Sequence, residues 1–318
     1  MRLEPFEPRA PQGGEISVRT QYSLMSIGTE TTILHARYDP GTHFAAMFSF
    51  PQLQTGVQAV ARVEAVGRGV SEFRPGEHIF MRMAHTSHWT LPAEQCSPVP
   101  EALELRSACW CGLAKTAFRA AHAAPFRLGG HVLIVGAGPV GQMAVRWARS
   151  AGMQRIAVID VSALRLSHAS RGGATDCVEG LLSDQRTKLL ALTAGNGFEL
   201  VVDSTGSASV FSQALSLIAK FGRLVLLGDT GYPTKQCLTS DVMIKGLTVV
   251  ATHDHNDQGG WNQRKIDALF FKLVRDGSFS LEGLITHTFT PTQCEQAYAL
   301  ASERREEAVG VLFDWTQG

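Results

Sequence analysis

Three glycines in the segment Gly136-Ala137-Gly138-Pro139-Val140-Gly141 have the spacing of a phosphate-binding loop. The segment follows the apolar run 131–135 and begins a run of helical composition that ends near Gly152. In such a loop the first glycine makes a tight turn, the second lets the backbone approach a pyrophosphate, and the third lets helix and strand pack closely. Free N–H groups at the helix N-terminus then bind phosphate oxygens. We therefore expect dinucleotide contacts from Gly136, Gly138, Pro139, Val140 and Gly141.

An acidic residue stands at the distance from this loop that a ribose contact requires. Asp160 ends the apolar run 155–160, 24 residues after Gly136. A carboxylate there accepts hydrogen bonds from the adenosine ribose hydroxyls and repels a 2′-phosphate, which favours NAD over NADP. Arg165 lies just beyond the acid and can either line the adenosine pocket or accept that phosphate. NAD is therefore the expected cofactor and NADP the alternative, with Asp160 and Arg165 both at the site.

Small and polar residues also follow the later apolar runs of the chain. Ligands of open parallel sheets bind at the carboxyl ends of the strands, so residues at these ends are expected to face the cofactor. Ordinary loop residues are the alternative at each position. The residues concerned are Ser204, Thr205, Gly228, Asp229, Thr252 and His253.

The elements that must position these residues alternate between strand and helix. From about residue 131, short apolar runs alternate with helical runs, which predicts βαβ crossovers and a parallel sheet covered on both faces. Residues 14–100 instead carry short runs in partial alternation, cut by Gly and Pro, which predicts antiparallel strands. A single helix is expected over 107–124 and another over 262–277. The fold class is therefore α/β, with a β-rich domain and a doubly wound parallel-sheet domain.

Composition excludes several classes of protein. The 318 residues carry 29 Lys and Arg against 29 Asp and Glu, so the formal net charge is zero and no nucleic-acid partner is expected. With 44% hydrophobic and 18% charged residues, the chain does not have a disordered composition. Six Cys without a CxxC pair are too few for a disulfide scaffold. Neither a signal peptide nor a membrane span of about 18 apolar residues is found, so a cytoplasmic location without membrane contact is expected.

Several segments resemble the medium-chain dehydrogenase/reductase superfamily, which includes zinc alcohol, sorbitol and threonine dehydrogenases. These segments run nearly from end to end, and they are Leu24–Glu30, 55–67, 74–80, 136–152 and 284–300. The resemblance implies a GroES-like catalytic domain of residues 1–120 and 262–318, with a Rossmann dinucleotide-binding domain of residues 121–261 between them. It also implies a small-molecule substrate and a homodimer or tetramer.

The sequence departs from this superfamily at the zinc ligands. Zinc members bind the catalytic metal through a Cys, a His and a third Cys or Glu. The Cys position holds Ile27, the His position holds Val57, and the accompanying Glu is Gln58. Only Cys111 lies near the third-ligand position. Because Ile and Val offer no ligand atom, no zinc and no other metal is expected.

A metal site rebuilt from other histidines is the alternative. His85 and His88 lie three residues apart in HTSH, His43 lies upstream, and His253 and His255 lie far downstream. No carboxylate or Cys motif accompanies the HTSH pair. Hydrogen-bonded or solvated histidines are therefore the favoured interpretation.

Without zinc, a general acid or a hydrogen-bond donor must take over the polarisation of a carbonyl group. Lys115 lies on the helix expected to enter the cofactor cleft, and Glu30 lies at the tip of the segment that carries the first zinc ligand in the superfamily. A solvated side chain is the alternative at each position. The catalytic candidates are Lys115, Glu30, His43 and His88, with His253 and Tyr38 as further proton donors.

The leading functional hypothesis is a zinc-independent NAD(H)-dependent oxidoreductase that interconverts a secondary alcohol and a ketone on a polyol, sugar or ring-bearing substrate. The opening Ser26-Ile27-Gly28-Thr29-Glu30 is similar to that of the bacteriochlorophyllide dehydrogenase-like branch. An NADPH-dependent enone or quinone reductase and a non-catalytic dinucleotide-binding protein are the alternatives. The apolar segment 44–51 is expected to form a pocket wall or lid, or else a buried strand or helix.

Overall fold

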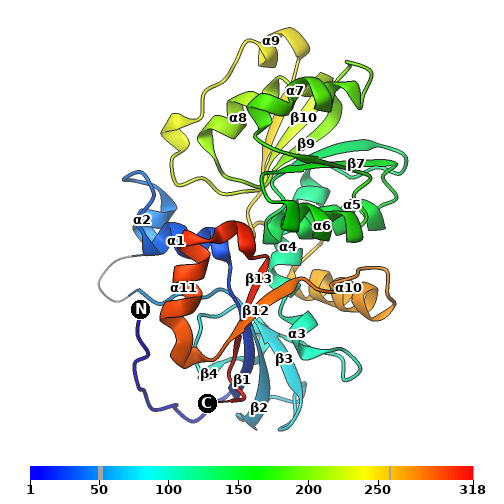
Figure 1. Cartoon of the computed structure of the whole chain (residues 1–318). Helices are drawn as coiled ribbons and strands as arrows, with labels where there is room; N and C mark the ends of the chain where they lie inside the picture. The colour runs from blue at the N-terminus through cyan, green and yellow to red at the C-terminus, as the bar shows by residue number, and fades with distance from the viewer. Residues whose placement is uncertain (49–52, 258, 318) are drawn as a thin grey trace. The chain divides into compact units, whose positions relative to one another are not determined.

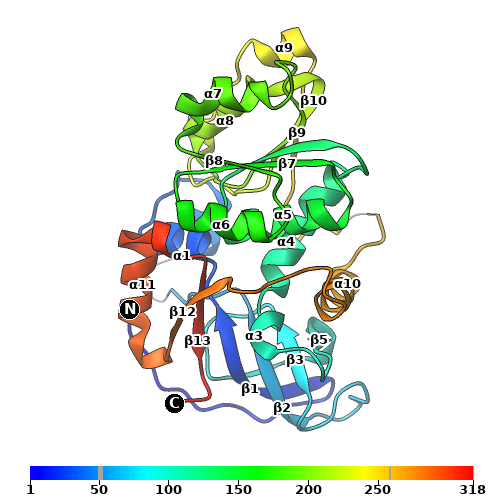
Figure 2. The same cartoon turned by 45° about the vertical axis from the view of Figure 1, so that its right-hand side comes forward.

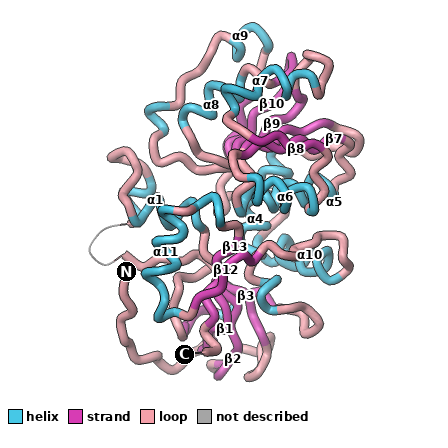
Figure 3. Tube along the Cα trace, in the orientation of Figure 1, coloured by secondary structure: helices cyan, strands magenta, loops and turns pink. Residues whose placement is uncertain are grey.

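The computed structural model describes residues 1–48, 53–257 and 259–317, and the chain divides into two compact units. Unit 1 comprises Met1–Thr31, Gln52–Gly112 and Gly259–Gly318. Unit 2 comprises Thr32–Pro51 and Leu113–Gln258. Each unit has its own sheet, whose strands are magenta in Figure 3.

Unit 1 is built on a mixed, seven-stranded sheet with the order β12-β13-β1-β2-β3-β5, in which β4 also pairs with β1. The pairs are antiparallel except β12 with β13, which is parallel. The antiparallel strands predicted within residues 14–100 are therefore confirmed. The strands are β1 (Glu15–Leu24), β2 (Ala59–Val66), β3 (His78–Met81), β4 (His88–Pro92), β5 (Cys96–Pro98), β12 (Ile285–Phe289) and β13 (Gly310–Asp314).

Alternating burial along β1 defines the core of this sheet. Ile16 and Val18 are fully buried and pack in one cluster with Ala61, Ile79 and other apolar residues of the neighbouring strands. The partly alternating run 15–28 predicts a longer strand, but β1 ends at Leu24 because a helix begins at Ile27. The helices with residues in unit 1 are α1 (Ile27–Leu34), α3 (Leu105–Ala108), α4 (Cys111–Ala123), α10 (Gln263–Arg275) and α11 (Cys294–Glu303), with 3-10 turns η1 (Ala93–Gln95), η3 (Pro291–Gln293) and η4 (Arg305–Glu307).

The helix expected over 107–124 is interrupted. It forms as α3 and α4, with a break at Cys109 and Trp110, and both of these side chains are fully buried. The predicted helix 262–277 is present as α10, where the Asn262 side chain caps the first turn by accepting from the Lys265 N–H at 3.1 Å. The apolar face of α10 buries Ile266 and Phe270.

Unit 2 is built on a six-stranded, entirely parallel sheet with the order β11-β10-β9-β6-β7-β8. The first strand in the chain lies in the middle and the order runs outward in both directions, which is the doubly wound arrangement that the sequence predicted. The α/β fold class is thereby confirmed. The strands are β6 (His131–Val135), β7 (Arg155–Asp160), β8 (Asp176–Glu179), β9 (Phe198–Asp203), β10 (Ile218–Leu226) and β11 (Thr248–Ala251).

Helices cover both faces of this sheet, with α5 and α6 on one side and α7 and α8 on the other (Figures 1 and 2). Burial from both sides explains why strands such as β6 are continuous apolar runs and not alternating ones. The helices with residues in unit 2, besides α1 and α4, are α2 (His43–Met47), α5 (Pro139–Ser150), α6 (Ala163–Arg171), α7 (Leu182–Ala191), α8 (Ala208–Leu215) and α9 (Asp241–Lys245), with the 3-10 turn η2 (Pro233–Lys235). Among the described residues, no helix is long and apolar enough to cross a membrane.

Candidate functional site

The glycine loop joins β6 to α5, and two of its glycines are required by the backbone itself. Gly136 has φ +90°, and a Cβ on it would lie 2.8 Å from Cγ2 of Thr205. A Cβ on Gly141 would lie only 2.0 Å from the carbonyl oxygen of Gly136. The strand and the helix thus approach each other more closely than any side chain at these positions allows.

Gly138 is different, because the residues that the structure describes leave open the space beside it. The nearest atom to a Cβ built there is Nη1 of Arg165, at 4.0 Å. Gly138 is also the N-cap of α5 and makes no side-chain hydrogen bond, and Pro139 stands in the first turn. The open space and the helix N-terminus fit a phosphate group, as the sequence suggested.

Asp160 and Arg165 both lie beside this loop. The Asp160 carboxylate accepts from the backbone N–H of Ala137 at 2.7 Å and from that of Ser162 at 2.8 Å, one on each oxygen. A carboxylate oxygen can accept two hydrogen bonds, so each one keeps capacity for a ribose hydroxyl. Arg165 is buried at the start of α6 with its guanidinium near Gly138. Asp160 and Arg165 are therefore placed where they can contact either NAD or NADP.

The ends of the central strands meet the loop along one edge of the sheet. Ser204 donates its hydroxyl to the carbonyl oxygens of Val135 at 3.0 Å and Gly136 at 2.8 Å. The Thr205 hydroxyl donates to Asp203 at 2.6 Å, and a Cβ on Gly228 would lie 2.5 Å from the N–H nitrogen of Gly206. Thr252 continues the pairing beyond β11, with its N–H donating to the Leu226 carbonyl at 3.4 Å.

Further along the same edge, three side chains that are distant in sequence come together, namely His43, Asp229 and His253; we call them the His–Asp–His cluster. Nε2 of His43 lies 2.9 Å from Oδ2 of Asp229, and one ligand-type atom from each of the three residues lies within 4.8 Å of the other two. The rings of His43 and His253 meet edge to face at 5.7 Å. The cluster follows the carboxyl ends of β10 and β11.

Charge and burial act in opposite directions on this cluster. Partial burial raises the pKa of Asp229, and the nearby His43 and His253 oppose that rise. Burial also lowers the pKa of His253, with the neighbouring His255 contributing. His253 is therefore disposed to remain neutral, while the His43 imidazole faces a carboxylate. Of the four catalytic candidates, His43 is the one with this acid partner at a strand end.

Lys115 is buried on α4 and forms an ion pair with Asp254, with Nζ 3.2 Å from Oδ2. The Thr116 hydroxyl donates to the same carboxylate at 3.5 Å. Asp254 directly follows His253 in the chain, so this buried pair anchors the segment that carries His253. The sequence suggested Lys115 but gave no sign of Asp254 as its partner.

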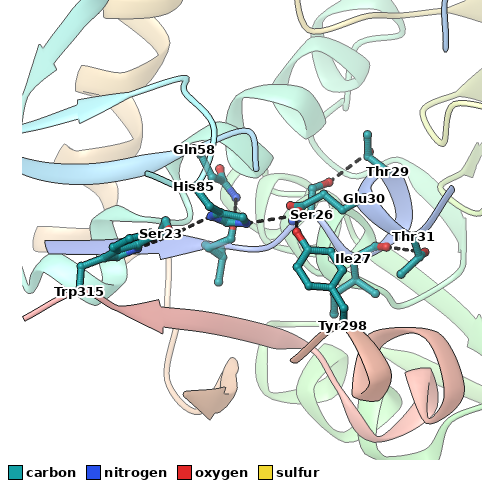
Figure 4. A network of polar contacts seen from close by, with 11 residues as sticks. Ser23, Ser26, Ile27, Thr29, Glu30, Thr31, Gln58, His85, Tyr298 and Trp315 are labelled. Carbon is teal, nitrogen blue, oxygen red and sulfur yellow. Dashed lines mark hydrogen bonds and ion pairs between the residues drawn. The ribbon is translucent and has the colours of Figure 1, made fainter. Parts of the chain in front are cut away.

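Glu30, another catalytic candidate, lies in unit 1 within a closed hydrogen-bond network (Figure 4). One oxygen accepts from the Ser26 N–H at 2.7 Å; the other accepts from the Tyr298 hydroxyl and lies 3.1 Å from Nε2 of His85. Nδ1 of His85 lies 2.8 Å from the Ser23 hydroxyl. Glu30 is fully buried, so its carboxylate joins α1, the residue 85 segment and α11.

The shifted pKa of Tyr298 shows which group donates the hydrogen bond to Glu30. Burial, reinforced by the Glu30 carboxylate, raises the pKa of Tyr298 well above its ordinary value, so its hydroxyl stays protonated and donates. Beyond His85, the Trp315 indole N–H donates to Ser23 at 2.8 Å. The sequence did not identify Tyr298 or Trp315, because nothing local connects them to residue 30.

The two histidines of HTSH do not converge on one point. His85 bonds to Glu30 and Ser23, whereas His88 contacts Ser87 at 3.1 Å and lies 3.9 Å from Glu64. They are hydrogen-bonded histidines, which was the favoured interpretation. His88 thus has a surface acid as its neighbour.

The residues at the expected zinc positions do not fit a metal. Ile27 is buried and apolar, and Val57 has no ligand atom. Gln58 is fully buried, with its amide N–H₂ donating to the Leu24 carbonyl at 3.4 Å. Cys111 is buried as well. Two of the three protein ligands of a catalytic zinc are therefore missing at these positions.

The apolar segment 44–51 lies only partly within the described residues. Phe44 is buried, and its ring stacks on that of Tyr38 at 5.9 Å. The Tyr38 hydroxyl donates to the carbonyl of Phe48 at 3.3 Å, which ties the phenol to this segment. Residues 49–51 lie outside the part that the structure describes, and the wall or lid expected of this segment remains a prediction.

Comparison with known proteins gives a consistent family signal. Residues 139–263 match the family model described as zinc-binding dehydrogenase. The chain is 31% identical over 169 residues to L-threonine 3-dehydrogenase of Bacillus licheniformis, covering 53% of this chain and 47% of that protein. It thus spans about half the length of the first such relatives. A longer match, to L-threonine 3-dehydrogenase of Anaeromyxobacter dehalogenans, is 28% identical over 294 residues and covers 82% and 81% of the two chains.

Solved structures agree on the fold over nearly the whole length. The galactitol-1-phosphate dehydrogenase of Escherichia coli superposes with a TM-score of 0.82 at 18% identity, covering 98% of this chain and 96% of the other. The 2R,3R-butanediol dehydrogenase of Bacillus subtilis superposes with a TM-score of 0.78, also at 18% identity, covering 98% and 96%. At 18% sequence identity, these structural similarities are evidence for the fold alone.

Proposed function

Because the chain belongs to the medium-chain dehydrogenase/reductase superfamily, we propose that it is a zinc-independent, NAD(H)-dependent oxidoreductase that interconverts a secondary alcohol and a ketone. The substrate class we propose is a polyol, a sugar or a ring-bearing alcohol, within the branch that resembles bacteriochlorophyllide dehydrogenases. Residues 1–120 and 262–318 are proposed as the GroES-like catalytic domain and 121–261 as the Rossmann domain of a cytoplasmic homodimer or tetramer.

The glycine loop and the strand ends are proposed to hold the dinucleotide. Gly138 leaves room for the pyrophosphate, Asp160 has free acceptor capacity for the ribose, and Gly228 and Asp229 follow β10, two strands from the loop. Strands are spaced about 4.8 Å apart, so these residues lie about 10 Å along the edge from the loop, toward the nicotinamide end. When bound, the nicotinamide supplies or accepts the hydride.

The proton chemistry is proposed to fall to His43, and the single observation that carries this is its 2.9 Å contact with Asp229. An ionised Asp229 can only accept, so Nε2 of His43 carries the proton between them and Nδ1 keeps its lone pair. That nitrogen can take the proton of a substrate hydroxyl as the hydride leaves, and can return it in the reverse direction. The carboxylate stabilises the imidazolium that forms, as in other His–acid pairs.

The other candidates receive supporting roles in this proposal. Lys115 anchors the His253 segment through Asp254, and Glu30 holds the segment after β1 in a fixed position. Burial keeps both charged groups away from solvent. His88, beside Glu64, is left with a surface role.

A reductase that uses NADPH is the second candidate, favoured by one observation. Arg165 lies in the first turn of α6, just beyond Asp160 at the proposed ribose site, and a guanidinium there can pair with a 2′-phosphate. Such an enzyme would act on enones or quinones. A preference for NADPH over NADH would support this candidate and overturn the NAD assignment.

The experiment compares His43→Gln with His255→Gln, which changes an exposed histidine on the segment after β11. The purified, chelator-treated proteins are titrated with NADH and NADPH by fluorescence and assayed on a panel of secondary alcohols and ketones. We expect His43→Gln to lower kcat about 100-fold or more with NADH affinity within threefold of wild type, and His255→Gln to leave both unchanged.

Three outcomes would contradict the proposal. Full activity in His43→Gln would remove this residue from the reaction. One tightly held zinc per chain, whose removal abolishes turnover, would overturn zinc independence. Dinucleotide binding without turnover across the whole panel would favour the non-catalytic dinucleotide-binding protein.

A further inference from the structure

The His–Asp–His cluster has the donor set of a transition-metal site. Two imidazole nitrogens and one carboxylate oxygen form a ligand set that suits zinc-class dications, whereas magnesium and calcium prefer sites built of oxygen donors alone. One ligand-type atom from each of His43, Asp229 and His253 lies within 4.8 Å of the other two. All three residues belong to unit 2, and none of them is a residue at which the superfamily carries its catalytic zinc.

The spacing is close to what a tetrahedral ion requires. With metal–ligand bonds of about 2.0–2.2 Å, neighbouring ligand atoms of a tetrahedron lie about 3.4 Å apart. Here the contact between Nε2 of His43 and Oδ2 of Asp229 is 2.9 Å, and the widest separation in the cluster is below 4.8 Å. The movement needed is thus on the order of 1 Å. The side chains of His43 and Asp229 are 43% and 40% exposed, so they can make that adjustment and solvent can reach them.

The surrounding structure holds the third ligand in place. The buried Lys115–Asp254 ion pair fixes the segment that carries His253, because Asp254 directly follows this histidine in the chain. Thr42 caps the short helix α2 through the Ala45 N–H, which positions His43 at its first residue. The segments that carry His43 and His253 are therefore both tethered.

We propose that a zinc-class divalent cation binds the His–Asp–His cluster and inhibits the enzyme. The inhibition rests on the proposed function, in which the His43–Asp229 pair handles the substrate proton. A cation coordinated by Asp229 and an imidazole nitrogen of His43 takes the carboxylate and the lone pair that this pair uses, and the imidazole then has no free site for a proton. One carboxylate and two neutral imidazoles leave a net charge of +1, which also disfavours imidazolium formation.

Binding must compete with protons, since a coordinated imidazole nitrogen cannot also carry one. We therefore expect affinity for the cation to fall as pH drops from 7.5 to 6.0. The charged and titratable groups facing the cluster are Asp229 itself, His255 and Asp254, the last of which is paired with Lys115. The ring of His255 lies 5.0 Å from that of His253.

The test uses the full chain after chelator treatment, titrated with ZnCl₂ by calorimetry and with CoCl₂ by visible absorption. We expect one equivalent of Zn²⁺ to bind and MgCl₂ to give no signal. His253→Gln and Asp229→Asn should each weaken zinc binding at least tenfold. His255 is not one of the three ligands, so the zinc affinity of His255→Gln should stay within threefold of wild type.

Activity measurements then separate the site from its effect. In the wild type, rising Zn²⁺ should abolish turnover over the same concentration range in which it binds. Zinc binding that is absent, or unchanged in both ligand variants, overturns the site whatever the activity. Stoichiometric binding without inhibition overturns the regulation alone. Stoichiometric binding by a protein without turnover keeps the metal site but refutes both the inhibition and the proposed function.

Discussion

Replacing Gly138 with alanine tests whether the glycine loop is shaped for a pyrophosphate or only for its own fold. The added methyl group meets no protein atom closer than 4.0 Å, and the backbone at Gly138, with φ −65° and ψ −178°, suits any residue. We therefore expect the free energy of unfolding to change by no more than about 1 kcal/mol. The methyl group does, however, occupy the space that a phosphate needs to reach the α5 amides.

Gly141→Ala is the matched control, since it adds the same methyl group at another glycine of the motif. Its Cβ would lie 2.0 Å from the Gly136 carbonyl oxygen, so the strand and helix must move apart. Overpacking of this kind costs about 1–3 kcal/mol, and a rigid loop raises the cost further. The two variants should thus separate stability from binding.

Urea unfolding and NADH fluorescence titration measure the two effects. For Gly138→Ala we expect an unfolding midpoint near that of the wild type and at least a tenfold loss of NADH affinity, about 1.4 kcal/mol. For Gly141→Ala we expect a clearly lower midpoint. Wild-type NADH affinity in Gly138→Ala would refute the assignment of this glycine to the pyrophosphate.

Three further predictions follow from single side chains. Asp160→Ala should weaken NADH binding far more than NADPH binding in parallel titrations, and equal losses would remove the ribose assignment. Glu30→Ala leaves three buried donors without an acceptor and should lower the free energy of unfolding by about 3–5 kcal/mol. Tyr298→Phe removes only one donor and should lower it by about 1 kcal/mol. A larger loss for Tyr298→Phe than for Glu30→Ala in urea unfolding would contradict the network. Burial lowers the pKa of His168, so its protonation in the unfolded chain should reduce stability as pH falls below about 6.5. His168→Gln should therefore lose less stability than wild type between pH 7.5 and 5.5, and identical losses would exclude His168 as a source of acid sensitivity.

Features that depend on a few consecutive residues could be predicted from the sequence. The glycine loop, the acid at the end of β7 and the alternation of strands and helices are all local, because backbone conformation and strand or helix periodicity are set by near neighbours. The errors were local as well. The end of β1 at Leu24 and the break between α3 and α4 depend on how buried side chains such as Trp110 pack, which periodicity does not encode.

The sequence by itself thus determined the nucleotide loop, Asp160 beside it and the absence of ligand atoms at Ile27 and Val57. Only the tertiary structure decided which side chains act together. Glu30 contacts His85 and Tyr298, which lie 55 and 268 residues further along the chain. His43 contacts Asp229, which follows a strand in the second half of the sequence. Such contacts depend on strand order and register, which arise from packing summed over the whole core, so no pattern of neighbouring residues contains them.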